Sequence, residues 1–363
     1  MRIAFFGSSL TSSYWNGAAT YYRGLLRALA RLGHDIAFYE PDAFDRQRHR
    51  DIADPDWARV VVYAATDAGW QSALEDGARD ADLLVKASGV GVFDMELECA
   101  VPEARRSEAI CVYWDVDAPA TLEAIEADQT HHLRRAIPRY DAVFTYGGGQ
   151  PVVNAYSRCG ARRCEPIYNA LDRSTHHPAP ASTQFSCDLS FLGNRLPDRE
   201  ARVEAFFFKA ASSLPDRTFL LGGSGWEDKP VPANVRRLGH VGTADHNAFF
   251  CSGLATLNIN RAGMARFGFS PPTRIFEAAG AGACLISDDW PGLDDFLTPD
   301  DEVLVAREGN EVAAALASLS PERAHRIGEA ARRHVLAEHT YDHRARQVHR
   351  LLDIIPLQNE AAA

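Results

Sequence analysis

The sequence predicts an α/β fold made of two doubly wound halves, and three observations support this prediction. Short apolar runs alternate with amphipathic helical patterns along most of the chain, which is typical of parallel sheets covered by helices. The length of 363 residues fits two domains of roughly 100–200 residues each. A stretch rich in Pro, His and Ser, residues 169–182, interrupts the pattern and is typical of a linker. We therefore expect domains over residues 1–170 and 171–340, followed by a segment over residues 341–363 that contains a last helix.

The first half begins with a predicted buried strand at residues 2–7, which ends at a glycine. A polar loop over residues 8–16 leads into a predicted helix over residues 17–32, where apolar side chains recur at helical spacing and Gly33 follows as the terminator. The other elements expected in this half are strands over residues 35–39, 81–87, 109–114 and 140–145, and a helix over residues 121–135.

The second half repeats the same alternation after the linker. Its predicted strands cover residues 187–192, 217–221, 235–238, 254–259, 283–287 and 302–305. Its predicted helices lie near residues 199–212, 245–252, 273–281, 310–318 and 321–338, with the last helix from about 341 to 355. Ligands of open parallel sheets bind at the carboxyl ends of the strands, so we expect a cleft between two such ends.

Composition excludes several classes of function. The chain has 38 Lys+Arg against 49 Asp+Glu, a formal net charge of -11, so nucleic acid is a poor partner. No apolar run approaches the ~20 residues that span a bilayer, and we expect a cytoplasmic protein without a transmembrane segment. The seven cysteines never form Cys-x-x-Cys, which argues against a disulfide framework and a zinc site. The pairs His131-His132 and His176-His177 are adjacent in sequence, where side chains diverge, so no metal site is expected.

The most informative motif is SPPTRIFEAAGAGACLISD, residues 270–288. Thr273 follows two prolines and is predicted to cap a helix, whose free N–H groups and dipole favour an anion. Arg274 lies in the first turn beside such an anion, and Glu277 lies where a carboxylate accepts hydrogen bonds from vicinal hydroxyls. Phosphate, cation and hydroxyl acceptor in this order indicate a nucleoside diphosphate site. The alternative is an ordinary amphipathic helix with solvated Arg274 and Glu277.

This motif resembles the donor-binding signature of glycosyltransferases with the GT-B fold. More closely, it is similar to the spore-maturation CgeB-type branch, in which a Pro-x-x-Arg-x-Phe-Glu helix precedes a Gly-rich turn and a strand. Further stretches agree in order and spacing over roughly residues 186–350: DLSFLGNR from Asp188, LLGGSGW from Leu220, LGHV from Leu238, LNINR from Leu257 and PGLDDF from Pro291. The resemblance implies the GT-B fold, with two Rossmann-like domains facing each other across a cleft and a last helix that crosses back to the N-terminal domain.

The same resemblance implies roles for individual residues. Glu277 would bind the nucleotide ribose, while Arg261 and Arg274 would hold the diphosphate beside Thr273. Arg195 is expected to join those two arginines at one helix N-terminus. The remaining donor-binding residues implied are Gly193, Asn194, Gly223, Trp226, His240 and Val241. Many related enzymes carry a second acidic residue seven positions before the ribose-binding Glu, but here that position is Ser270, so a mechanism that needs it is in doubt.

The first half offers weaker candidates. Asn16 and Gly17 close the loop after the first strand and suit a close approach to a phosphate or sugar, unless the loop is ordinary surface. Asp115 and Asp117 follow another strand, where one of them is a candidate general base toward an acceptor hydroxyl or orients it. The alternatives are that one of them caps the helix near Pro119, or that Asp-x-Asp is the metal motif of the other major glycosyltransferase fold.

Together these features predict a metal-independent glycosyltransferase. The second half is expected to bind a nucleotide-diphosphate sugar as co-substrate, and the first half an unidentified acceptor hydroxyl, with no other cofactor. A nucleotide-sugar epimerase or hydrolase on the same fold is one alternative, and an inactive nucleotide- or glycan-binding module is another. Hydride transfer from NAD is disfavoured because the first strand is not followed by Gly-x-Gly-x-x-Gly. The sequence leaves open the sugar, the nucleobase and the stereochemical outcome.

Overall fold

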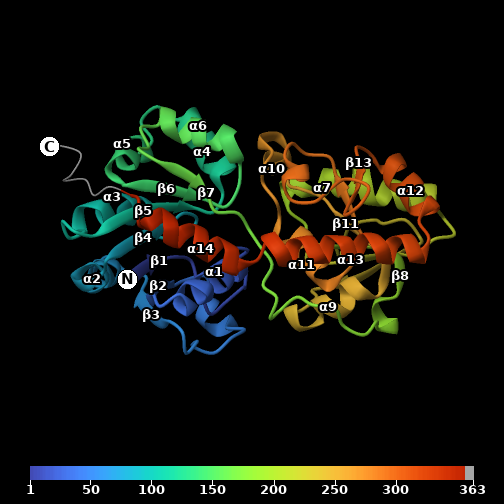
Figure 1. The fold of residues 1–363 in the computed structure, drawn as a ribbon, viewed down its shortest axis with the longest axis horizontal. Coiled ribbons are helices and arrows are strands. Elements are labelled where there is room, and N and C mark those ends of the chain that lie inside the picture. The colour runs from blue at the N-terminus through green and yellow to red at the C-terminus, as the bar shows by residue number, and fades with distance from the viewer. Residues whose placement is uncertain (356–363) are drawn as a thin grey trace. The chain divides into compact units, whose positions relative to one another are not determined.

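A computed structural model describes residues 1–355 of the chain and divides it into two α/β units (Figure 1). The first unit comprises residues 1–168 together with the segment from Tyr341 onward, and the second comprises Asn169–Thr340. The expected domains have boundaries at residues 170 and 340. Residues 356–363 of the expected last segment lie outside the described residues. The donor and acceptor roles of the two halves stay predictions.

The first unit contains a seven-stranded parallel sheet in the order β3-β2-β1-β4-β5-β6-β7. Strand β1 lies between β2 and β4, with Ile3 opposite Ile36 on one side and Leu83 on the other. The strands are β1 (Arg2–Phe6), β2 (Asp35–Asp42), β3 (Arg59–Ala64), β4 (Leu83–Ala87), β5 (Ile110–Asp115), β6 (Ala142–Thr145) and β7 (Cys164–Pro166). The helices are α1 (Ala19–Arg31), α2 (Asp67–Asp80), α3 (Asp94–Ala104), α4 (Ala118–Ala127), α5 (Leu133–Ala136), α6 (Gly149–Arg158) and α14 (Tyr341–Leu352).

Two expectations for the first unit need correction. The helix predicted over residues 121–135 is divided into α4 and α5, because the Asp128 side chain accepts a hydrogen bond from Thr130 N at 2.8 Å and forms a turn between them. The edge strands β3 and β7 and the helices α2, α3 and α6 were not expected. Strand β3 alternates between exposed and partly buried positions, and β7 has only three residues, so neither shows a buried apolar run.

The last helix, α14, packs against the first one, α1, within the first unit (Figure 1). Gly24 of α1 makes this close contact possible, since a Cβ atom added there would lie 2.2 Å from the ring of Tyr341. The ring of Tyr341 also meets that of Tyr21, with centroids 5.9 Å apart. The C-terminal helix therefore completes the core of the N-terminal unit.

The second unit contains a six-stranded parallel sheet in the order β10-β9-β8-β11-β12-β13. Every strand expected from the sequence is present, as β8 (Cys187–Leu192), β9 (Phe219–Gly222), β10 (Val235–Gly239), β11 (Gly253–Asn258), β12 (Leu285–Asp288) and β13 (Leu304–Ala306). The helices are α7 (Pro197–Val203), α8 (Lys209–Ser213), α9 (Thr243–Cys251), α10 (Ala262–Phe267), α11 (Thr273–Ala281), α12 (Gly309–Ser318) and α13 (Pro321–Glu338). A π-helical stretch, Glu204–Phe208, joins α7 to α8 where one helix was expected.

The carboxyl ends of β8, β9 and β11 lie next to one another in this sheet, because β8 pairs with both β9 and β11. The loops that follow these strands therefore lie close together at the carboxyl edge of the sheet. They comprise residues 193–196, 223–226 and 259–261. Within residues 1–355, none of the helices combines the length and the apolar character that crossing a membrane requires.

Candidate functional site

Arg274 is the centre of the candidate site, and its side chain is buried at the edge just described. It belongs to the first turn of α11, and 9% of the residue is exposed. Its Nε donates a hydrogen bond to the carbonyl of Leu192 at 2.6 Å, and its Nη1 donates one to Asn258 Oδ1 at 2.9 Å. These partners end strands β8 and β11, so the sheet itself fixes the direction of the guanidinium.

Arg274 is a buried cation without an ion-pair partner among the described residues. Its pKa is lowered to about 9, first by burial and then by the nearby Arg199, while Glu277 and Asp288 oppose the change. Its guanidinium lies 5.0 Å from the centre of the Phe191 ring, a contact that stabilises a cation only modestly. A buried charge of this kind is costly unless a counter-charge accompanies it. The arrangement thus favours an anionic ligand.

Arg199 of α7 adds a second guanidinium to the same place. A Cβ atom added at Gly193 would lie 3.0 Å from Arg274 Nη2 and 3.2 Å from Arg199 Nη1, so both groups cover the backbone of this glycine. Arg199 Nη1 donates to the carbonyl of Asn194 at 3.0 Å, but its buried Nε has no hydrogen-bond partner within residues 1–355. Burial lowers the pKa of Arg199, and Arg261 lowers it further.

Arg261 brings a third positive charge, which is partly neutralised. It precedes α10 and its Nε donates to Asp198 Oδ2 at 2.6 Å. We call Arg199, Arg261 and Arg274 the arginine cluster. Planar guanidiniums offer paired N–H donors that match phosphate oxygens, and hydrogen bonds between charged partners are about twice as strong as neutral ones. The arginine cluster is therefore suited to a diphosphate.

Two sequence expectations about this site are corrected by the structure. Thr273 does not cap α11: Pro272 occupies the capping position, Thr273 is the first helical residue, and no side chain caps the helix. Arg195 does not join the cluster, because carboxylates from two other segments hold it. Its Nε donates to Glu200 Oε2 at 2.8 Å and its Nη1 to Asp228 Oδ1 at 2.9 Å. Arg199, four residues later, stands in its place.

The loops around the arginine cluster are fixed by glycine and tryptophan. Gly223 has φ +123°, and a Cβ atom there would lie 2.2 Å from the carbonyl oxygen of Gly193. Trp226 is 1% exposed and its Nε1 donates to that same carbonyl at 2.8 Å. Asn194 is exposed and its Oδ1 accepts from the backbone of Ser224 at 3.0 Å. Trp226 thus supports the Gly193 loop with its ring inside the core.

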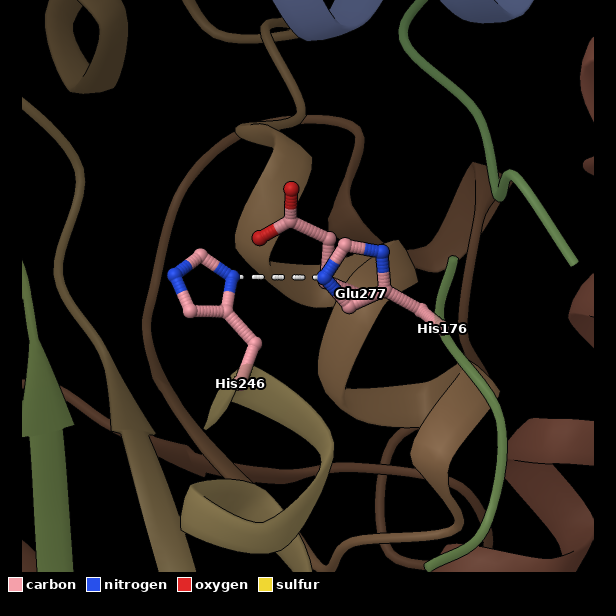
Figure 2. A group of neighbouring side chains, drawn as sticks. All are labelled: His176, His246 and Glu277. Atoms are coloured by element: carbon pink, nitrogen blue, oxygen red, sulfur yellow. Dashed lines mark hydrogen bonds between the residues drawn. The ribbon is translucent and has the colours of Figure 1, made fainter. Parts of the chain in front are cut away.

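Glu277 lies one turn after Arg274 on α11 and is half-buried. It makes no hydrogen bond or ion pair with the rest of the described chain, so its carboxylate is available to a ligand. The imidazoles of His176 and His246 lie beside the carboxylate of Glu277 (Figure 2). Burial lowers the pKa of His246, which Glu277 partly opposes. Near this end of α9, His240 is exposed and Val241 is buried.

Asp115 and Asp117 differ sharply in environment within the first unit. Asp115 ends β5 and is fully buried, with hydrogen bonds from Ser88, Thr121, Tyr156 and the backbone of Asp117. Burial raises its pKa to about 6, although Tyr156 and Ser88 act in the opposite direction. Asp117 is partly exposed at the N-terminus of α4, where its side chain forms no capping hydrogen bond. Of the two, Asp117 is the one that a substrate can reach in this conformation.

Asn16 holds its own loop together. Its Nδ2 donates to the carbonyls of Ser9 and Ser12, at 2.9 and 3.0 Å, and its Oδ1 accepts from Ser8 Oγ at 2.9 Å. Gly17 is exposed, and no atom lies within 4 Å of an added Cβ. The amide of Asn16 is thus engaged in shaping the loop, whereas Gly17 leaves open space beside it.

Sequence reasoning missed Arg199, Asn258 and His246. Arg199 had a signal, since it lies in the first turn of the helix that follows β8, where an anion is favoured. Asn258 ends β11, a position typical of functional groups in parallel sheets. His246 carries no local signal, because its neighbours His176 and Glu277 are distant in sequence.

Comparison with known proteins gives a consistent picture. Residues 199–350 match a family model described as "Glycosyl transferase-like". No curated protein sequence matches the chain. Sucrose-phosphate synthase from Thermosynechococcus elongatus is structurally similar, with a TM-score of 0.69, 14% identity and 100% of both chains covered.

Two further solved structures are complexes. HepE from Anabaena, in complex with UDP and glucose, has a TM-score of 0.68 and 15% identity, with 97% of this chain and 99% of that chain covered. An alpha-glucosyltransferase in complex with UDP-glucose and DNA containing an abasic site has a TM-score of 0.71 and 12% identity, with the same coverage. The chain therefore has the GT-B fold of glycosyltransferases, and its residues 199–350 carry the glycosyltransferase-like family pattern.

Proposed function

We propose that this protein transfers a sugar from a nucleoside-diphosphate sugar to the hydroxyl group of an acceptor, as a cytoplasmic enzyme. The arginine cluster is the observation that carries the proposal. Arg199 and Arg274 form no ion pair within the described residues and Arg261 pairs with Asp198, so positive charge gathers at the carboxyl end of a parallel sheet. Departure of a sugar leaves a nucleoside diphosphate with an additional negative charge, and donors already aimed at that charge lower the barrier.

The position of Glu277 supports the nucleotide part of the proposal. It lies one helical turn from Arg274, and its carboxylate has no partner in the described residues that competes with a ligand. The two hydroxyls of a ribose donate hydrogen bonds, and a carboxylate without other partners accepts from both. The resemblance of residues 270–288 to the CgeB-type motif implies the same role for Glu277. UDP and UDP-glucose are the first ligands to test, because two of the similar structures contain them.

Thermal shift with UDP, GDP, dTDP and ADP tests donor binding directly, since a ligand that binds only the folded state stabilises it by RT ln(1+[L]/Kd). Glu277→Ala is expected to abolish most of the shift while leaving the unliganded melting temperature unchanged, because Glu277 makes no hydrogen bond that the fold needs. Unchanged affinity of this variant for every nucleotide would refute the site.

We propose that transfer needs no metal ion, because the arginine cluster supplies the positive charge that a divalent cation supplies elsewhere. Turnover in excess EDTA tests this point.

An epimerase or hydrolase would consume the donor without any acceptor, which a nucleotide-release assay measures. A binding module would bind the nucleotide sugar but release no nucleoside diphosphate from it with any acceptor.

Asp117 is proposed to meet the acceptor hydroxyl, and Asp117→Asn is expected to lower turnover without weakening nucleotide binding.

A further inference from the structure

Two histidines and one glutamate from three separate segments meet beside the candidate site (Figure 2). His176 comes from the segment that opens the second unit, His246 from the first half of α9, and Glu277 from α11. One nitrogen of each imidazole and one carboxylate oxygen lie within 4.8 Å of one another. The two histidines are 70 residues apart in sequence, so their proximity is a product of the fold.

The hydrogen bonds of His176 determine which of its nitrogens carries the proton. Its Nδ1 lies 3.0 Å from Thr175 Oγ1, and that hydroxyl donates to the carbonyl of Asp172 at 3.1 Å. When the single hydroxyl hydrogen is used there, Thr175 accepts a hydrogen bond from His176 Nδ1–H. A neutral His176 then has its lone pair on Nε2, and this nitrogen faces His246 (Figure 2).

His246 is arranged in the complementary way. Its Nδ1 is the nitrogen turned toward His176, as Figure 2 shows, and the backbone of Val241 lies close enough to its imidazole to favour the protonated ring. When the ring donates to that backbone from Nε2, Nδ1 keeps its lone pair. In these tautomers each histidine directs its N–H toward an oxygen, the arrangement that orients metal-bound histidines. Two lone pairs then face each other, and a cation bound between the two nitrogens would satisfy both.

The separation of the two nitrogens fits a shared metal ion. His176 Nε2 and His246 Nδ1 are 3.3 Å apart. Two nitrogens bound to one tetrahedral zinc ion at ~2.0–2.1 Å are about 3.3–3.4 Å apart. The pair therefore has the spacing of two ligands.

Glu277 supplies the third donor. Its carboxylate lies beside the gap between the two rings (Figure 2), and no hydrogen bond within the described residues holds it in its present rotamer. A small rotation of this side chain brings an oxygen to the ion. Two histidines and a carboxylate are a common ligand set for zinc, with water in the fourth position.

We infer that His176 Nε2, His246 Nδ1 and a carboxylate oxygen of Glu277 form a binding site for one divalent transition-metal ion, with Zn²⁺ as the fitting probe. This site goes beyond the proposed function, which uses no metal. The sequence expectation concerned the adjacent pair His176-His177, whereas the proposed partner of His176 is His246; His177 is exposed and turned to the carbonyl of Pro178.

The test is a Zn²⁺ titration of tag-free, metal-stripped protein in competition with a chromophoric chelator, without any nucleotide. His246→Gln, His176→Gln and Glu277→Gln are expected to weaken the site at least ~100-fold, since losing even an outer partner costs ~10–100-fold. His177→Gln is the matched control and retains wild-type affinity. Co²⁺ bound to the wild type is expected to show the visible absorption of a tetrahedral site, and His246→Gln to lack it.

A second cluster in the described chain, His334, Glu338 and His339, needs its own control. His334 Nδ1 is already engaged by Glu302 Oε2 at 2.7 Å, so His334→Gln is expected to leave the affinity unchanged. Loss of binding in His334→Gln but not in His246→Gln would overturn the inference. Equal Zn²⁺ affinity in the wild type and Glu277→Gln would overturn it as well, and circular dichroism melting curves verify that each variant is folded.

Discussion

Removing the charge of Arg199 separates its proposed role in ligand binding from any role in the fold. In the change Arg199→Gln, the side chain stays polar but loses the guanidinium beside Gly193 and Arg274, together with its hydrogen bond to the exposed Asn194. A hydrogen bond to a charged group contributes ~1.5–3 kcal/mol, so the affinity for a nucleoside diphosphate is expected to fall by about 10- to 150-fold.

The same change is expected to stabilise the unliganded protein. Burial and Arg261 both lower the pKa of Arg199, which means that the folded state disfavours its charge. The pKa of Arg274 is lowered in part by Arg199. Because neutralising one member relieves both effects, the melting temperature without nucleotide is expected to rise, a trade of stability against function.

Titration calorimetry with the best-binding nucleoside diphosphate and with its parent nucleoside measures the first effect. Arg326→Gln is the matched control, since Arg326 is exposed on α13 and the same charge is lost. The diphosphate affinity is expected to fall only in Arg199→Gln, with the nucleoside affinity unchanged in both variants. An equal loss for nucleoside and diphosphate, or a lower melting temperature without ligand, would show that Arg199 serves the loop and would refute this reasoning.

Three further predictions follow from other parts of the molecule. Burial raises the pKa of Asp115 from 3.8 to about 6, so ionising it costs about 3 kcal/mol; chemical denaturation is expected to show the wild type losing stability relative to Asp115→Asn as the pH rises from 4 to 6, and a parallel pH profile would contradict this. Gly223→Ala is expected to lower the free energy of unfolding by at least ~2 kcal/mol, through its positive φ and its contact with Gly193; a denaturation midpoint equal to that of the wild type would contradict it. Zn²⁺ is expected to weaken nucleotide binding in the wild type, because both ligands need Glu277. It is not expected to do so in His246→Gln. Because the nucleotide chelates Zn²⁺ equally in both measurements, the variant also controls for that chelation.

Much of the second unit could be predicted because its sequence signals are local. The bounds of α11 and α13 agree with the predicted ranges, 273–281 and 321–338. In α13, Ser320 accepts from Arg323 N and Pro321 occupies the first helical position, which are strong start signals. Strand β7 could not be predicted, because three residues at a sheet edge do not produce a pattern.

The members of the arginine cluster could be predicted only in part. Arg195 and Arg199 follow the same strand, and the one local signal, the place of Arg199 in the first turn of α7, does not show that Arg195 is held elsewhere. The deciding partner of Arg195, Asp228, lies 33 residues away. The same limit applies to His176 and His246, which meet only through the packing of α9 and α11 with the opening segment of the second unit. Long-range pairs of polar side chains depend on the whole fold, whereas helix ends depend on a few neighbouring residues.

The packing of α14 on α1 has a consequence for the order in which the protein forms during synthesis. Residues 1–168 leave the ribosome first, but the surface of α1 around Tyr21 and Gly24 stays uncovered until Tyr341 has been synthesised. The second unit is continuous in sequence, from Asn169 to Thr340, and has all its strands before α14 is made. Because domains generally fold as they are completed, the N-terminal unit, although begun first, is finished last.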